Sequence, residues 1–199
     1  MGVTIVKKLP KYGRNLKKKV KGVMPYVAQY LRSCADRKIR DGVPPENAPL
    51  TKEVKQGSQT LRDNGTLAAS ISEHSGDDWA AAGTNVKYAK INQEGGIIIS
   101  KGKGLWIPAG SETRRLMRKF GATKPGQLIT SMKAAGYNMW RRGGAFMASS
   151  KGGKPFVLFI IKASVKIPAR PFLYITEREE KFIMDKINSA VMDSLKEDK

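Results

Sequence analysis

The chain has 199 residues, of which 40% are hydrophobic and 27% charged, with 37 Lys and Arg against 17 Asp and Glu. The apolar fraction is too high for a disordered basic tail, and the length is sufficient for one real hydrophobic core. No run approaches ~18 consecutive apolar residues, so no transmembrane helix is predicted.

The first predicted element is a helix over residues 14–40. Its apolar face is formed by residues at steps of three to five, namely Leu16, Val20, Val23, Val27, Leu31, Cys34 and Ile39. Pro25 predicts either a kink or a second helix that begins there. Cys34 is interpreted as a small buried hydrophobe, and Gly42 with Pro44 and Pro45 ends the helix.

A polar loop is expected over 43–60, followed by a turn at 63–65. Imperfect alternation of apolar and polar residues over 67–73 and an apolar run over 79–83 predict a hairpin. A short helix is expected over 86–93.

The segments 97–99 and 105–107 flank Lys-Gly-Lys-Gly and predict a second hairpin. Ser111 is expected to cap a helix that ends at Phe120, whereas 125–135 is ambiguous. Three further strands are predicted at 137–140, 145–148 and 156–165.

A capping box of Thr176 and Glu179 opens the last predicted helix. Strands joined by tight turns favour antiparallel pairing over βαβ units. The predicted fold is therefore α+β, with an antiparallel or mixed β-sheet built from hairpins and packed by a long N-terminal helix and a C-terminal helix.

The sequence shows no recognisable catalytic motif. It has one cysteine, Cys34, and one histidine, His74, and no motif links them. The glycine-rich segments are spaced as hairpin turns rather than as phosphate-binding loops, and Asp77 with Asp78 is interpreted as a solvated turn. We therefore expect no catalytic residues, no metal and no cofactor.

The net charge of +20 is concentrated in residues 1–40 (+11) and 101–170 (+14), while 41–100 and 171–199 are slightly acidic. Such blocks point to polyanions or to acidic protein surfaces. The candidate contacts are Lys17, Lys18, Lys19, Lys21, Arg141 and Arg142. Because Tyr137, Trp140 and Phe146 stand near the two arginines, a basic DNA-binding protein with non-specific phosphate contacts remains an alternative.

Four segments, in order, resemble motifs of the phage virion morphogenesis, or tail completion, family. They are Pro49-Leu-Thr51, Asp63-Asn-Gly-Thr-Leu-Ala-Ala-Ser-Ile71, Gly83-Thr-Asn-Val-Lys-Tyr-Ala89 with Gln93 and Gly95-Gly96, and Ile167-Pro-Ala-Arg-Pro-Phe-Leu173. Asn92 stands where the family usually has His, and Glu94 stands where an aromatic residue is common.

The resemblance implies a single virion morphogenesis domain over 1–199 with a basic insertion at about 100–155. It implies a structural assembly protein of a tailed bacteriophage or prophage that completes the tail or joins tail to head. The protein would form a ring with itself, possibly a hexamer, and meet the tail tube, tail terminator or head connector. It would reside in the virion neck or tail end, and in the host cytoplasm during assembly, with no membrane contact.

Structural roles are expected for the motif residues. They are Asp63, Gly65, Leu67, Ser70, Ile71, Gly83, Thr84, Asn85, Tyr88, Gln93, Gly95, Ile167, Pro168, Ala169, Arg170, Pro171 and Phe172. Arg170 is expected to pair with a carboxylate of a neighbouring subunit or of its own first helix. Most basic residues are predicted to face acidic virion proteins or solvent, and 43–60 and 100–155 to form interfaces.

Overall fold

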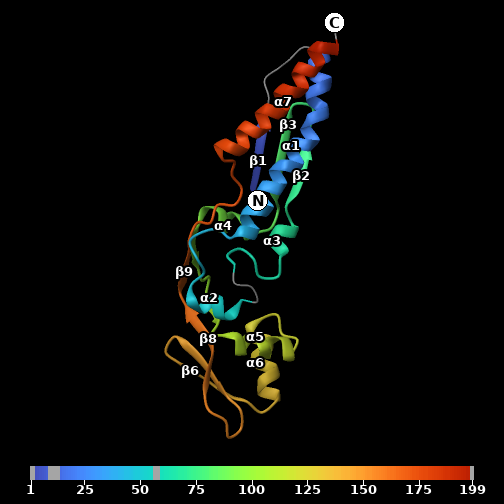
Figure 1. Cartoon of the computed structure of the whole chain (residues 1–199). Coiled ribbons are helices and arrows are strands. Elements are labelled where there is room, and N and C mark those ends of the chain that lie inside the picture. The colour runs from blue at the N-terminus through green and yellow to red at the C-terminus, as the bar shows by residue number, and fades with distance from the viewer. Residues whose placement is uncertain (1–2, 9–13, 56–58, 198–199) are drawn as a thin grey trace. The chain divides into compact units, whose positions relative to one another are not determined.

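A computed structural model describes residues 3–8, 14–55 and 59–197 (Figure 1). The chain divides into two compact units. Unit 1 comprises Met1–Glu46, Gln59–Gly95 and Pro168–Lys199, and unit 2 comprises Asn47–Ser58 and Gly96–Ile167. The basic insertion expected at about 100–155 lies within the longer segment of unit 2.

Two long helices pack together in unit 1. α1 (Arg14–Asp41) is a single helix that contains Pro25, so the alternative of a second helix starting there was wrong. α7 (Glu177–Glu197) begins as predicted, because the Glu179 amide donates to Thr176 Oγ1 at 3.3 Å and the Thr176 amide donates to the Glu179 carboxylate at 2.9 Å. The shared core contains Val20, Met24, Val27, Ala28, Leu31, Ala80, Ala82, Ile183 and Ile187.

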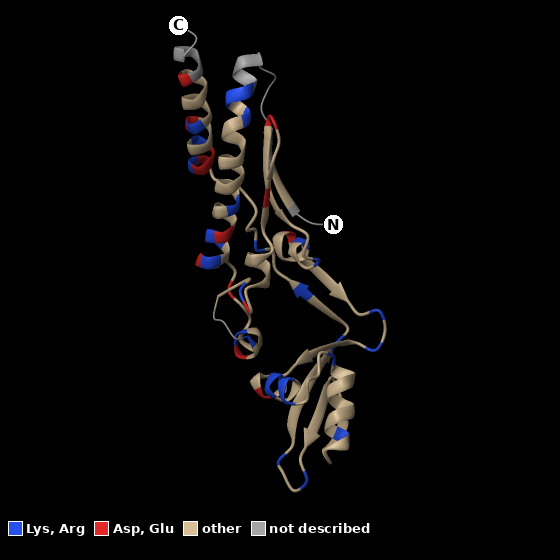
Figure 2. Cartoon of the chain, turned by 90° about the vertical axis from the view of Figure 1, so that its right-hand side faces the viewer, with Lys and Arg blue, Asp and Glu red and all other residues tan. Residues whose placement is uncertain are grey.

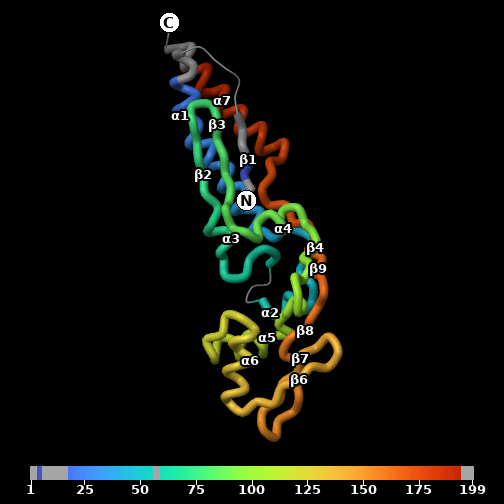
Figure 3. The backbone as a smooth tube through the Cα atoms, turned by 180° about the vertical axis from the view of Figure 1, so that it is seen from behind, coloured from blue at the N-terminus to red at the C-terminus, as the bar shows by residue number. Residues whose placement is uncertain are grey.

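The same core rests on a three-stranded antiparallel sheet in the order β1-β3-β2. Its strands are β1 (Val3–Lys8), β2 (Ser72–Ser75) and β3 (Trp79–Thr84). Figures 1 and 3 show α1 lying over this sheet. Ala80 and Ala82 face the helix and are fully buried, so small side chains on β3 allow α1 to approach closely.

The predicted hairpin of unit 1 is confirmed, because β2 pairs with β3, with Ser72 opposite Gly83 and His74 opposite Ala81. The predicted start of its first strand was wrong, because residues 66–69 form the short helix α3 (Thr66–Ala69). The Asn64 side chain accepts the Thr66 amide at 3.3 Å, and Gly65 adopts a left-handed φ of 82°, which favours a helical start over a strand. β1 was not predicted.

A second core of unit 1 lies where α3 and α4 (Ala89–Glu94) meet the end of α1. Its buried members are Ala35, Ile39, Val43, Leu67, Ile71, Ala89, Phe172 and Leu173. Cys34 is also buried, as interpreted from the sequence.

Unit 2 contains three helices and six strands among its described residues. They are α2 (Pro49–Val54), β4 (Gly96–Ile99), β5 (Leu105–Pro108), α5 (Ser111–Lys119), α6 (Pro125–Ala134), β6 (Asn138–Arg142), β7 (Ala145–Ser149), β8 (Phe156–Lys162) and β9 (Ser164–Ile167). β4 pairs with β9, and the other strands form a four-stranded sheet in the order β5-β8-β7-β6. All pairs are antiparallel, which confirms the α+β prediction with hairpin-built sheets.

Three local predictions in unit 2 were wrong. The segments 97–99 and 105–107 do not pair with each other, because β4 pairs with β9 and β5 pairs with β8. The predicted strand 156–165 is divided between β8 and β9, and the expected loop at 43–60 contains α2.

Helices α5 and α6 cover one face of the four-stranded sheet. Leu116, Leu128 and Met132 of these helices share a core with Ala148, Leu158 and Phe159 of the strands. The register between β7 and β8 shifts after Phe146, so that Phe146 pairs with Phe159 and Met147 pairs with Val157. This β-bulge lets the consecutive residues Leu158 and Phe159 both reach the core, where they are 0% and 1% exposed.

Candidate functional site

Three of the four family-like motifs converge on the second core of unit 1. Leu67 and Ile71 come from the second motif and Phe172 from the fourth, and each is at most 2% exposed within the same cluster. Ala89, which follows Tyr88, is also part of it. Motif residues separated by about a hundred positions therefore form one packed junction.

Two hydroxyls join the second motif to the third. The oxygens of Ser70 and Thr84 lie 2.7 Å apart and share a hydrogen bond. Thr84 Oγ1 also accepts the Val86 amide at 3.2 Å, and the Ser70 hydroxyl lies 2.7 Å from the Leu67 carbonyl. These contacts fix the end of α3 against the end of β3.

Gln93 joins the third motif to the fourth. Its Oε1 accepts the amides of Phe172 at 2.9 Å and Leu173 at 3.0 Å, and its Nε2 donates to the Leu173 carbonyl at 3.1 Å. A single side chain thus supplies three hydrogen bonds to a segment that belongs to no strand at those positions. Next to it, the Arg170 amide donates to the Asn92 carbonyl at 2.7 Å.

Arg170 is 8% exposed and holds the loop that follows α1. Its Nε donates to the Pro45 carbonyl at 2.7 Å and its Nη2 donates to the Glu46 carbonyl at 3.0 Å. The expected carboxylate of the first helix is therefore replaced by two backbone carbonyls. Burial lowers the pKa of Arg170 from its ordinary value.

An ion pair that the sequence analysis missed links α1 to α7. Lys38 Nζ lies 2.9 Å from both oxygens of Glu179, donates to the Tyr174 carbonyl at 3.1 Å and sits 4.4 Å from the centre of the Tyr174 ring. Burial acts to raise the pKa of Glu179, but hydrogen bonds from Thr176, Lys38 and Cys34 outweigh it and hold the pKa at about 2. No spacing rule predicts a pair separated by 141 positions.

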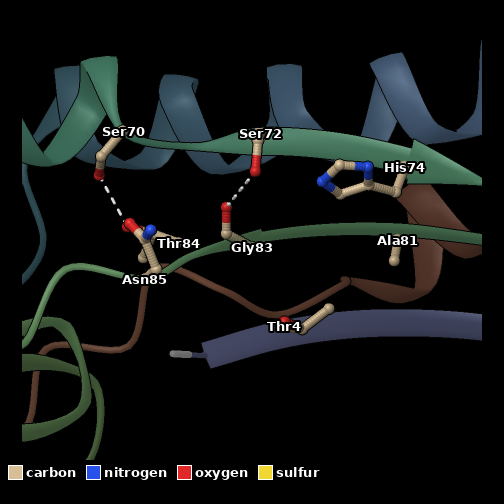
Figure 4. Close-up of a pocket in the computed structure, with 8 residues that line it drawn as sticks. All are labelled: Thr4, Ser70, Ser72, His74, Ala81, Gly83, Thr84 and Asn85. Carbon is tan, nitrogen blue, oxygen red and sulfur yellow. Dashed lines mark hydrogen bonds between the residues drawn. The ribbon is translucent and has the colours of Figure 1, made fainter. Parts of the chain in front are cut away.

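A pocket opens on the sheet of unit 1, on the side away from α1 (Figure 4). It is lined by Thr4, Ser70, Ser72, His74, Ala81, Gly83, Thr84 and Asn85. Ser72 donates weakly to the Gly83 carbonyl at 3.4 Å, and the Ser70 hydroxyl is held as described above. The lining includes His74 and two serines and carries no carboxylate.

The remaining motif residues take positions outside these contacts. Tyr88 is 45% exposed, Gly65 makes the turn before α3, and Gly95 ends α4 with a φ of 74°. Asp63 and Asn85 lie in the loops next to α3 and β3, while Ile167 is the last residue of β9. Pro168, Ala169 and Pro171 frame Arg170 in the segment that enters unit 1.

The candidate basic contacts occur in different units. Lys18 and Lys21 are exposed on α1, Lys19 is half-buried, and the side chain of Lys17 lies outside the described residues. Lys21 pairs with Asp77 at 3.0 Å. Arg141 and Arg142 are exposed at the end of β6 in unit 2. Figure 2 shows basic residues spread over both units rather than gathered at one place.

Two of the three aromatic residues considered for base stacking pack within unit 2. Tyr137 lies edge-on to Phe120 at 6.5 Å, and Phe146 packs against Trp106 at 5.1 Å between ring centres. Only Trp140 of the three is exposed, at 37%.

The charge is distributed unequally between the units. Unit 2 carries sixteen Lys and Arg against two Glu, a net of +14, whereas unit 1 carries twenty-one against fifteen, a net of +6. One of the two acidic residues of unit 2, Glu112, is held by Arg115 in a two-point pair at 2.7 and 2.8 Å. Unit 2 is therefore a strongly cationic body.

Within the described ranges, no group of three or more His, Cys, Asp and Glu side chains is placed to hold a metal ion. In the same ranges, no helix has the length and hydropathy needed to cross a bilayer.

The chain is thus an α+β protein with a packed motif junction in unit 1 and a strongly cationic unit 2. The model of the phage virion morphogenesis family matches residues 4–126, well over half of the chain, and the chain belongs to this family. It is a structural protein of phage assembly. No curated protein and no solved structure matches it. The motif at Ile167–Leu173 lies beyond the matched range, so its place beside Gln93 comes from the structure alone.

Proposed function

We propose that the chain completes the phage tail or joins the tail to the head, as one subunit of a ring, without catalysis and without a cofactor. The observation that carries this proposal is the use of Gln93. Its carboxamide binds the backbone of Phe172 and Leu173, so a polar motif residue stabilises the scaffold instead of facing a substrate. Such a fixed scaffold suits a member of the phage virion morphogenesis family, in which we expect the surfaces of the subunit to make the assembly contacts.

The sheet of unit 1 supports self-assembly. β3 lies in its centre, and β1 pairs on one side with β3 while its other edge has no strand partner among the described residues. An exposed edge is a template for pairing with another chain, and repetition of one head-to-tail contact closes a ring.

The test is electron microscopy of a phage that lacks this chain. Free heads together with finished or overlong tails should accumulate, and a plasmid copy of the gene should restore joined particles. Infectious particles with normally joined heads and tails in the absence of the chain would refute the proposal. Particles of ring size in the purified protein, seen by mass photometry, would support the oligomer.

The net charge of +14 on unit 2 favours a second candidate, non-specific DNA contact. A protein that neutralises several phosphates loses affinity by orders of magnitude between about 50 and 200 mM salt. If unit 2 binds DNA, the logarithm of the binding constant for duplex DNA should fall steeply with the logarithm of the salt concentration. If unit 2 binds proteins instead, no DNA binding should be measurable.

A further inference from the structure

The four-stranded sheet of unit 2 has one face that its own helices leave open. In the strand register, Trp140, Met147 and Val157 form one row across β6, β7 and β8, and Arg142, Ala145, Ile160 and Ile107 form the next row across all the strands. Leu105 and Lys162 pair beyond them. Side chains alternate along a strand, and the β-bulge at Leu158 and Phe159 shifts this alternation by one residue on β8, so these residues project to the same side. We call this set of residues the open face.

The helices lie on the other side of the sheet. The strand residues that pack against Leu116, Leu128 and Met132 are Trp106, Met139, Phe146, Ala148, Phe156, Leu158 and Phe159, and none belongs to the open face. Figures 1 and 3 both show α5 and α6 on one side of these hairpins. Val157 lies on an inner strand yet is 40% exposed, so nothing covers it in the described structure.

The open face is apolar with a cationic border. Its only charged members are Arg142 and Lys162, which are both exposed, and it has no acidic residue. A sheet face built from Trp, Met, Val, Ile and Leu side chains resembles the core of a protein interface more than a solvated surface, since such interfaces join an apolar centre to a polar rim and favour Trp, Met and Arg.

The positive charge of the open face indicates which kind of partner binds there. We propose that the open face docks an acidic virion protein that presents apolar side chains within a ring of Asp and Glu. A second copy placed face to face would bring Arg142 and Lys162 of both chains together with no acidic residue between them, in units that each carry +14. Nucleic acid would lay phosphates over Met147, Val157 and Ile160, which cannot pair with them. This inference deepens the proposed function by assigning it a partner class.

A photo-crosslinking experiment in assembling phage tests it. A photoreactive phenylalanine derivative replaces Trp140, and in a matched control the same derivative replaces Lys133, an exposed residue of α6 on the covered side of unit 2. Crosslinked products are isolated from particles that contain the chain and are identified by mass spectrometry. We expect an adduct from position 140 to one acidic virion protein, at least about tenfold more abundant than any adduct from position 133.

Three outcomes would overturn the inference: an adduct of twice the chain mass, an adduct to DNA, or equal labelling from both positions. The result is read in particles that contain the chain, whether or not the chain is what joins head to tail. The docking inference can therefore be refuted while the deletion phenotype confirms the proposed function. Conversely, the adduct can be observed even if the deletion phenotype refutes that function.

Charge reversal gives an independent readout. Arg142→Glu should reduce incorporation of the chain into particles by at least about tenfold, whereas Lys133→Glu, an equal change of charge in the same unit, should leave incorporation within about twofold. Trp140→Ala should also reduce it, because truncation of a central aromatic residue removes interface contact area. Both positions are exposed, so unchanged thermal midpoints will show that the variants fold. Normal incorporation of Arg142→Glu and Trp140→Ala would refute the docking surface.

Discussion

The carboxamide of Gln93 and the backbone of Leu173 are joined by two hydrogen bonds that run in opposite directions. The Leu173 amide donates to Oε1 at 3.0 Å, and Nε2 donates to the Leu173 carbonyl at 3.1 Å. This is the pattern of a paired strand, made here by a side chain. It fixes the chain where it enters unit 1 before α7.

Gln93→Ala should destabilise unit 1 by about 2–4 kcal/mol, because the Phe172 and Leu173 amides and the Leu173 carbonyl lose their partner in a partly buried place. Urea denaturation measures the loss, and hydrogen exchange at Phe172 and Leu173 should accelerate. Asn92→Ala is the matched control, since that side chain donates only to the Tyr88 carbonyl of its own helical turn. Equal effects of the two substitutions would contradict the proposed role of Gln93.

Arg170→Ala should cost about 2–4 kcal/mol, because two carbonyls of the loop after α1 lose charge-assisted hydrogen bonds. Arg170→Lys should recover only part of this, since an ammonium does not reproduce the fixed fork of a guanidinium. Thermal melting should therefore give the highest midpoint for the wild type, an intermediate one for Arg170→Lys and the lowest for Arg170→Ala. Arg178→Lys, at an exposed position of α7, is the control and should change the midpoint little. Full rescue by lysine would show that the two-carbonyl geometry is unimportant.

The Glu179 pKa of about 2 predicts an acid-sensitive contact between α1 and α7. Since the folded-state pKa lies below the unfolded value of about 4.5, the unfolded state takes up the proton first. The contribution is therefore complete above pH 4.5 and is lost as the pH falls toward 2, by up to about 3 kcal/mol. The difference in unfolding free energy between wild type and Glu179→Gln should shrink over this range. A difference that stays constant from pH 6 to pH 2.5 would contradict the assignment.

Gly104→Ala should destabilise unit 2 by about 1–3 kcal/mol. Gly104 has a φ of 94°, which costs an L-residue about 1–2 kcal/mol, and an added Cβ would also collide with the Ile161 side chain. Hydrogen exchange of the β8 amides checks it. Gly102→Ala lies in the same turn, and its Cβ would meet nothing within 4 Å. If Gly102→Ala is equally destabilising, the turn as a whole, and not the position of Gly104, sets the stability.

The long helices could be predicted because their signals are local. The apolar face of α1 and the capping box at Thr176 and Glu179 each lie within a few turns of chain. Strand pairing was harder, since the Lys-Gly-Lys-Gly segment resembles a hairpin turn but does not show which partner each strand prefers. β5 pairs with β8 instead, whose apolar run offers a longer partner.

The motif junction was predicted only in part. The resemblance singled out Gln93 and Arg170, but their partners are backbone groups, which a sequence pattern does not display. The bulge at Phe146 and Met147 was hidden for the same reason, because a one-residue shift of register leaves no mark in composition. The open face also could not be predicted from the sequence, because only the strand register shows that Trp140 and Met139 lie on opposite faces of the sheet.

Because unit 1 is built from three separate stretches of chain, its core can be completed only late in translation. Ile183 and Ile187 of α7 complete the core that Val20 and Val27 of α1 begin, while the stretch 96–167 of unit 2 is already finished when residue 168 is added. A chain that stops before α7 would leave uncovered the part of the apolar face of α1 that Ile183 and Ile187 contact, and such surfaces attract chaperones and proteases. The last helix to be translated therefore completes the core that the first helix begins, and we expect subunits without it to be degraded rather than assembled.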